Sequence, residues 1–555
     1  RHRHGAASRC FCAALRLLSP DTSDAELVTL FKNLASCAAL SRDVSAVIAQ
    51  LQDWRDTPPW RERPAVRAEA SLALASLFSH LSQHVESAHA RRTAALDLAT
   101  LARSADAARA LLAAATTLAF ALQLSLAAQT AAEASLAAEK ANDVATLAEA
   151  TKLAGFILGM QGHTAEGRRQ VEQALALALK HRLPGVAADA YRLLGNVAEY
   201  ASCYRDEQAA FSSALAYCRR HDQEVVAGLC LGCLAYSFFR SGHWKRSEAT
   251  VRRVLADRSA HPVSHMVASG VLGLLHAHRG ETRPAAKLLT NSLSAGRQMG
   301  IVAMDFFNLL GLALTAETAG DDSQAAAHYR TLFETWQRTE DRHDAIPGLA
   351  CAVIFHAERR ERDETARYAE ALETIAAASA NPEATGAALS ASAELSRLDG
   401  DHAAAVAGFR AALAAYEKRD LSGELIRVRL RLAAALIATQ QGDEARTLLN
   451  DAARRARRLG ARPLAAKAEA LLATCAPSRR GGSISTPTAR SAWDLLSARQ
   501  RDIARHLARG AANKEIASAL GLSVRTVEMH VGAVLARLDC RSRAHAAARI
   551  TAELG

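Results

Sequence analysis

Short cysteine and histidine patterns are the places where this sequence could bind a metal or react. "CLGC", with Cys230 and Cys233, has the spacing of half a zinc site or of a redox pair. No second cysteine or histidine pair follows it at ligand spacing, so two small core residues on one helix are the better interpretation. The histidines of "HPVSH" (261–265) and "HAH" (276–278) lack the carboxylate context of a metalloprotease. We therefore predict no metal site in these segments.

Two common catalytic motifs do not occur in the sequence. It contains no Gly-x-x-x-x-Gly-Lys-Ser/Thr phosphate loop and no Gly-x-Ser-x-Gly nucleophile elbow. No carboxylate, cysteine or histidine group has the spacing of a catalytic site. We predict a protein that is not an enzyme, with no catalytic residue and no cofactor.

A stripe near the C-terminus indicates recognition rather than catalysis. Arg525, Glu528, Met529 and Gly532 lie at i, i+3, i+4 and i+7, so they share one face of a helix expected over 524–538. The opposite face is apolar and comprises Val527, Val531, Val534, Leu535 and Leu538. A helix of this size fits the DNA major groove, where such a stripe can meet base edges. Glycine inside a helix costs about 1 kcal/mol relative to alanine, and close approach to another surface would offset that cost.

Two shorter helices are expected to position this stripe. The segment "LSARQRDIARHLARG" predicts a helix that buries Ile503 and Leu507 and ends at Gly510. A second helix is expected over 513–520, with Ile516, Ala517 and Leu520 facing inward. "GLS" then makes the turn, and Ser523 is placed to cap the stripe-bearing helix.

Together these helices resemble the LuxR-type helix-turn-helix family over about fifty-five residues. The resemblance is carried by G-x-x-N-K-E-I-A (510–517), by L-x-x-S-x-x-T-V-x-x-H (520–530) and by "LARLDCRSRAHA". It implies a bacterial transcriptional regulator that binds double-stranded DNA as a homodimer, often through its final helix. RNA polymerase would be a further candidate partner.

The resemblance also assigns roles to individual residues. It puts Glu528, Met529 and Gly532 toward the bases. Arg525 is expected to face bases as well, because it lies on the same stripe. The residues near the phosphate backbone are Lys514, Ser523, Thr526 and His530. The family often has Lys at the position of Glu528 and a polar or basic residue at the position of Gly532, so base preference cannot be transferred. Gln500 stands where the family commonly has Glu.

Most of the remaining sequence follows a period close to forty residues. Small or polar residues punctuate it at Gly162, Cys203, Gly242, Gly280, Gly320, Glu361, Gly400 and Gly442. A second series, half a period out of phase, comprises Pro184, Asp222, Pro262, Gly300, Arg342, Pro382, Leu421 and Pro463. The intervals of about twenty residues have helical apolar spacing, so each period predicts one helical hairpin.

These hairpins resemble the tetratricopeptide-repeat superfamily in its longer-period form, over about 70–474. Segments such as "VLGLL", "LLGLA" and "SQAAAHYRTLF" carry the resemblance, because their small residues let two helices approach closely. Such a solenoid presents a long concave surface, here expected to hold an unknown inducer or a protein. The sequence offers no polar cluster that can be nominated as a pocket. Larger LuxR-type proteins with such repeats often have an ATP-binding domain before them. Because this sequence starts without Met, loss of that domain stays open.

Composition agrees with an all-α protein of several parts. The 555 residues are half hydrophobic but only 5% aromatic. The last 79 residues hold thirteen Lys/Arg against six Asp/Glu, +7 of the net charge of +11, which favours a polyanionic partner. Ten cysteines, mostly within apolar helices, are typical of a reduced, cytoplasmic protein. The uncharged stretch 110–132 is rich in Ala, Thr, Gln and Ser, so a buried repeat helix is favoured over a membrane span.

These patterns predict four parts and leave two rivals. The parts are an N-terminal helical segment (1–69), tetratricopeptide-like repeats (70–475), a flexible linker (476–492) and a LuxR-type helix-turn-helix domain (493–555). The alternative is a non-enzymatic helical scaffold whose terminal helices bind protein. A sigma-factor-like promoter reader is less favoured, because no region for core polymerase is recognisable.

Overall fold

The computed structural model describes residues 2–39, 44–379, 381–417, 421–475, 496, 498–538, 540 and 542–554. Their regular secondary structure is entirely helical. The chain divides into two compact units, Arg1–Ser478 and Arg479–Gly555. The linker predicted over 476–492 lies outside the described residues, and the predicted domain boundaries stay predictions.

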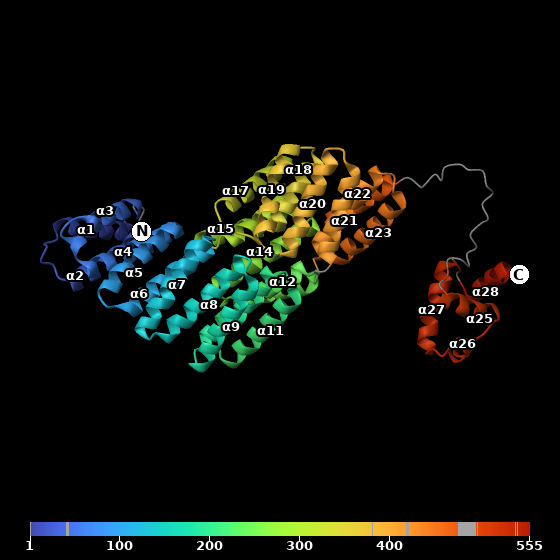
Figure 1. Cartoon of the computed structure of the whole chain (residues 1–555), viewed down its shortest axis with the longest axis horizontal. Helices are drawn as coiled ribbons and strands as arrows, with labels where there is room; N and C mark the ends of the chain where they lie inside the picture. The colour runs from blue at the N-terminus through green and yellow to red at the C-terminus, as the bar shows by residue number, and fades with distance from the viewer. Residues whose placement is uncertain are drawn as a thin grey trace. The chain divides into compact units, whose positions relative to one another are not determined.

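The described part of the first unit is a series of antiparallel helices (Figure 1). They are α1 (His2–Leu17), α2 (Asp24–Ala38), α3 (Val44–Asp56), the 3-10 helix η1 (Trp60–Glu62), α4 (Pro64–His80), α5 (His84–Thr100), α6 (Ser104–Phe120), α7 (Leu124–Ala141), α8 (Val144–Met160), α9 (Thr164–Lys180), α10 (Pro184–Tyr200), α11 (Tyr204–Arg220), α12 (Glu224–Arg240), α13 (Trp244–Ala256), α14 (Pro262–Arg279), α15 (Thr282–Met299), α16 (Ala303–Ala319), α17 (Asp322–Gln337), α18 (Ile346–Glu358), α19 (Arg362–Ala378), α20 (Pro382–Leu398), α21 (His402–Glu417), α22 (Ser422–Ala438), α23 (Gly442–Leu459) and α24 (Arg462–Thr474).

The predicted hairpin rhythm is confirmed, and it starts earlier than the glycine and proline punctuation. From α4 to α13 each helix begins 20 residues after the one before it. In each of these turns one residue is left-handed, at Ser82, Ala102, Leu122, Asn142, Gly162, Arg182, Ser202, Asp222 and Gly242. The turns are closed by backbone hydrogen bonds such as Gln123 N–H to Leu118 O, at 2.9 Å. The fold is therefore a tetratricopeptide-like solenoid.

Small residues bring the helices of a hairpin together, as the sequence predicts. A Cβ on Gly155 of α8 would lie 2.7 Å from the carbonyl oxygen of Gly167 on α9. Larger side chains fill the layer between hairpins, where Phe306, Tyr329 and Phe355 are almost completely buried. Small residues thus allow the close approach of α8 and α9, and aromatic side chains such as Tyr329 and Phe355 pack between neighbouring hairpins.

Successive turns of the solenoid touch each other at long sequence separations. These are 213–215 residues for His84–Arg297 and Ser125–Glu340 and 181 residues further along the chain. Four polar contacts join residues 181 positions apart: Gln161 O to Arg342, Tyr200 O to Asn381, Ser241 O to Ser422, and Glu281 to Arg462. Their first members lie about one forty-residue period apart. Over these four contacts, one superhelical turn takes about four and a half periods.

The half period has a structural consequence. Residues of the first punctuation series, such as Gly242 and Gly280, therefore lie against residues at or next to the second series, here Ser422 and Pro463, in the next superhelical turn. A Cβ on Gly242 would lie 2.8 Å from the Cβ of Ser422, and one on Gly280 would lie 3.2 Å from Pro463. These contacts connect segments that are remote in sequence and extend the contacts between neighbouring repeats.

The second unit contains α25 (Ala498–Ala508), α26 (Asn513–Leu520), α27 (Val524–Arg537) and α28 (Arg543–Leu554), seen in red in Figure 1. Among the helices described in either unit, none combines the length and the apolar character that a bilayer crossing needs.

Candidate nucleic-acid interface

The turn between α26 and α27 has helix-turn-helix geometry. Gly521 ends α26 in the left-handed conformation, with φ of +63°. The N–H of Thr526 then donates to Ser523 Oγ at 3.1 Å, so Ser523 caps α27 as the sequence predicts. Gly510 is also left-handed, with φ of +79°, and follows α25.

One small core holds the four helices in place. The residues predicted to face inward are buried: Ile503, Leu507, Ile516, Ala517, Val527, Val531, Val534 and Leu538, with Leu520 and Leu535 packed at its edge. From α28, Ala546 and Ile550 complete the cluster. The core therefore fixes which face of α27 points outward.

Polar contacts that the sequence reasoning missed also fix α26. Arg543 at the start of α28 donates to Asn513 Oδ1 at 2.6 Å. Arg499 on α25 donates to the carbonyl of Leu520 at 2.8 Å, and Glu515 accepts from the N–H of Ala512 at 2.7 Å. Both ends of α26 are thus held by side-chain hydrogen bonds.

The outer face of α27 contains the four residues predicted to face bases. Arg525, Glu528, Met529 and Gly532 are all exposed, and Met529 retains 66% of its accessible surface. Apart from its chain neighbours and the nearby backbone of α27, no atom lies within 4 Å of the place where a Cβ on Gly532 would stand. Packing within the described chain therefore does not require a glycine there.

The four phosphate candidates lie on two elements: Lys514 at the start of α26, and Ser523, Thr526 and His530 at the cap and in the first half of α27. Lys514 and Ser523 are exposed, while Thr526 and His530 are half-buried. The hydroxyl oxygens of Ser523 and Thr526 are 2.7 Å apart and belong to the cap. A phosphate contact by either hydroxyl would therefore share an oxygen that already stabilises α27. Lys514 and Arg525, which are basic, take no part in this cap.

The comparison with protein families decides what kind of unit this is. Residues 494–550 match the family model of bacterial regulatory proteins of the luxR family. The C-terminal unit contains a LuxR-family helix-turn-helix domain. This family match covers α25 to α27 and most of α28, and a LuxR-family DNA-binding domain supports a transcriptional regulator.

Solved structures similar to the chain are helical-repeat proteins. A Rap protein complexed with competence and sporulation factor is 14% identical, over 59% of this chain and 90% of that one, with a TM-score of 0.42. The Rap conjugation gene regulator of plasmid pLS20, in complex with the Phr* peptide, is 12% identical over 59% and 95%, with a TM-score of 0.40. The APC/C hetero-tetramer Cut9–Hcn1 is 15% identical over 86% and 94%, with a TM-score of 0.47. Among curated proteins, none matches.

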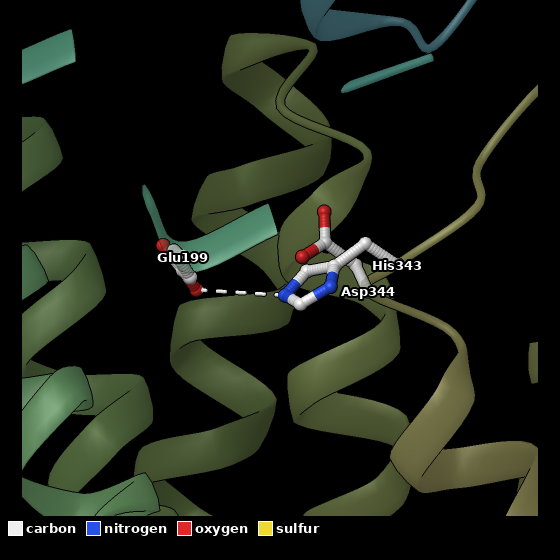
Figure 2. A group of neighbouring side chains, drawn as sticks. All are labelled: Glu199, His343 and Asp344. Atoms are coloured by element: carbon white, nitrogen blue, oxygen red, sulfur yellow. Dashed lines mark ion pairs between the residues drawn. The ribbon is translucent and has the colours of Figure 1, made fainter. Parts of the chain in front are cut away.

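A second candidate site lies inside the repeat unit and was missed at the sequence level. Glu199 at the end of α10 meets His343 and Asp344, which precede α18 (Figure 2). All three are buried, and their ligand atoms lie within 4.8 Å of one another. Among the described residues, this is the one group of three or more side chains with metal-ligand spacing.

The hydrogen bonds around His343 do not suit a metal. Asn381 Oδ1 accepts from the N–H of Glu383 at 2.8 Å, so its Nδ2 is the atom that faces His343 Nδ1 at 3.1 Å. His343 Nδ1 is therefore an acceptor, and the proton lies on Nε2, which points at Glu199 Oε1 at 3.9 Å. A metal bound on the side of Glu199 would need Nε2 to be bare and Nδ1 to donate, which is the opposite tautomer.

Charge burial explains the protonation of this cluster. Burial, and then the nearby Arg240, lower the pKa of His343 to about 3, so the ring is neutral. Burial raises the pKa of Glu199 to about 7 despite the attraction of Arg240. The cluster is a buried polar contact between α10 and the segment before α18.

The cysteine and histidine patterns also have structural roles. Cys230 and Cys233 lie on α12, and burial raises the pKa of the Cys233 thiol to about 11. His261 caps α14 by accepting from the N–H of Val263 at 3.3 Å. His276 contacts Glu281 at 2.5 Å. These contacts agree with the interpretation of both patterns as structural residues.

Proposed function

We propose that this protein is a transcriptional regulator whose LuxR domain recognises a specific duplex DNA sequence through α27. The observation that supports this most directly is the exposed stripe Arg525, Glu528, Met529 and Gly532, opposite a fully packed face. Glu528 could accept a hydrogen bond from a cytosine amino group, and Met529 could contact a thymine methyl group.

Affinity would come largely from the phosphate backbone. Lys514 lies exposed at the start of α26, and Ser523, Thr526 and His530 lie along the start of α27. We propose that these residues set the position of α27 on the duplex while the stripe reads bases. The resemblance to the LuxR family further supports binding as a homodimer in the cytoplasm of a bacterium, with RNA polymerase as a candidate partner. The repeat unit would act as the sensing or scaffold region.

The deciding experiment is selection from random duplex DNA by the purified chain, followed by a salt titration of the selected site. A two-fold symmetric site is expected for a dimer. Met529→Asp should abolish preference for that site. Lys514→Glu should weaken binding to all sequences and lower the salt slope by about one unit.

Matched controls are available on the repeat unit. Leu136→Asp places the same charge at another exposed apolar residue, and Lys287→Glu makes the same charge reversal at another exposed lysine. Both controls should bind as the wild type does. If Met529→Asp and Lys514→Glu also bind as the wild type does, α27 is not the DNA-reading helix, and the scaffold alternative gains support.

A further inference from the structure

A cavity of about 450 Å³ lies inside the repeat unit, between helices from two superhelical turns. It is lined by α14, α16, α18, α22 and α24. Much of the wall is apolar: Leu314, Ile354, Leu430, Leu464 and Leu471. Its volume is within the usual range for sites that bind small organic molecules.

Most charged groups on the cavity wall are already paired. Arg359 donates to Asp322 at 3.0 Å, outside the cavity. Arg431 donates to Glu394 at 2.9 Å, and Lys467 donates to Glu358 at 3.1 Å. These pairs satisfy the cations within the protein, as buried charges usually require.

Arg427 on α22 is different. Its guanidinium forms no ion pair with any residue that the structure describes, and its recorded hydrogen bond is a long one, 3.5 Å, to Nδ1 of His278. Burial, and then Arg427 and Arg240, hold the pKa of His278 well below its usual range, so this ring is neutral. Arg427 therefore keeps its positive charge and most of its five N–H donors for another partner.

The position of Arg427 directs those donors to the cavity. Arg427, His278 and Cys351 line both this cavity and a narrow space of about 40 Å³ beside it. A Cβ on Gly423, one helical turn earlier, would lie 3.3 Å from Arg427 Nη1, so the small residue leaves room for the guanidinium. The guanidinium thus stands where the large cavity meets the narrow one.

Glu317, the acid on the wall that has no ion pair among the described residues, does not replace a ligand. Glu317 accepts from the hydroxyl of Tyr329 at 2.6 Å, and burial raises the pKa of its carboxyl group. One unpaired guanidinium beside such an acid suits a single negative charge better than a doubly charged phosphate. A carboxylate also matches the planar fork of arginine.

We propose that this cavity binds a small organic molecule with one carboxylate and an apolar body, with the carboxylate paired to Arg427. The apolar body fills the space between α16, α18, α22 and α24. The proposal does not depend on DNA binding, because every residue that lines the cavity belongs to the repeat unit.

The test is isothermal titration of the full chain, without DNA, with straight-chain carboxylates from hexanoate to dodecanoate and with the matching primary amides. Carboxylate affinity should rise about threefold to fourfold per methylene until the cavity is filled, and then level off. Amides should bind more weakly than carboxylates of equal length. A wild-type chain that binds no carboxylate at millimolar concentration, or binds amides equally well, would overturn the proposal.

Variants locate the binding. Arg427→Met should weaken carboxylate binding about 10- to 100-fold and leave amide binding unchanged. Arg359→Met removes a cation on the same wall whose partner is Asp322, and should change neither. Ala434→Trp, which fills the cavity from α22, should abolish both. Circular dichroism checks that each variant is folded. If Arg427→Met does not fold, the proposal is tested by Ala434→Trp and by the comparison of carboxylates with amides in the wild-type chain. Unchanged carboxylate binding by folded Arg427→Met or Ala434→Trp would overturn the proposal.

Discussion

Gly532 shows how a single residue can separate stability from recognition. It lies inside α27, is exposed, and has open space where a Cβ would stand. Gly532→Ala should therefore stabilise α27 by about 1 kcal/mol, because alanine is the better helix former. Hydrogen exchange of α27 amides in the full chain would measure this gain. Faster exchange in the alanine variant would mean that an unseen contact requires the glycine.

A larger side chain at position 532 should lower DNA affinity, although it does not destabilise α27. If α27 enters the major groove, Gly532→Leu places bulk between the helix and the bases. Binding to the selected site should fall by about tenfold or more, while α27 stays as protected from exchange as in the alanine variant. Equal DNA affinity for both variants would show that Gly532 does not face the duplex closely.

Glu199 makes the contribution of the buried cluster to stability depend on pH. Its pKa is raised from 4.5 to about 7, chiefly by burial, with Glu383 adding to the effect and Arg240 and Asn196 opposing it. The native state therefore keeps a proton that the unfolded chain releases between these pH values, so this contribution to stability falls as pH rises from about 4.5 to 7. His343, with a lowered pKa, acts oppositely and destabilises as pH falls below its usual value of 6.5.

Glu199→Gln should remove the loss of stability that accompanies deprotonation of Glu199. Glutamine resembles the protonated acid, so the variant should be more stable than the wild type at pH 8, by no more than about 3 kcal/mol, and the two should converge near pH 4.5. Guanidinium unfolding followed by circular dichroism at several pH values measures this. Glu172→Gln, at an exposed residue paired with Arg168, is the matched control and should change little. A parallel pH profile for Glu199→Gln would contradict the assignment.

At the scale of the elements, the spacing of apolar residues predicted the helices and their buried faces better than Gly, Pro and polar residues predicted the turns. The faces of α26 and α27 followed from the positions of residues such as Ile516 and Val527, because burial of one helix face is a local pattern. The forty-residue rhythm was visible only from Gly162 onward, where most turns are marked by Gly, Pro or a polar residue. Earlier turns place Ala102 and Leu122 in the left-handed conformation, and neither residue type indicates a turn in a sequence.

The buried polar groups were not predictable by the same reasoning. Glu199 and His343 are 144 positions apart, and only the superhelical turn brings them together. Arg427 had a local signal, since "LIRVRLRL" places three arginines within an apolar helix. Which of those three stays without an ion pair depends on helices from elsewhere in the solenoid.

The left-handed turns make a stability prediction. Ala102 is exposed with φ of +57°, a conformation that costs a residue with a Cβ about 1 kcal/mol. Ala102→Gly should therefore raise the unfolding free energy by about that amount. Ala411→Gly, at an exposed position inside α21, makes the same chemical change in a helical conformation and should lower it by about 1 kcal/mol. Denaturant midpoints that move in the same direction for both would refute the argument from backbone conformation.

At the scale of the whole repeat unit, contacts between superhelical turns should couple distant segments. Asn381 is the best place to test this, because its buried side chain serves both turns. It caps α20 through the N–H of Glu383, accepts from Ser202 Oγ at 2.9 Å and donates to the carbonyl of Tyr200 at 3.1 Å. Ser202 and Tyr200 belong to the turn of the superhelix that precedes α20 by about 180 residues.

Asn381→Ala should destabilise the unit by about 3–5 kcal/mol, since it removes a cap and leaves buried polar groups unpaired. Asp321→Ala removes a cap from α17 and should cost about 1 kcal/mol. Among the described residues, no hydrogen bond or ion pair joins the Asp321 side chain to another superhelical turn. Hydrogen exchange distinguishes the two effects. In Asn381→Ala the amides of α10, remote in sequence, should exchange faster along with those of α20, whereas Asp321→Ala should affect only the region of α17. If α10 is unchanged in Asn381→Ala, each repeat is stabilised by its sequence neighbours alone, as in an open solenoid.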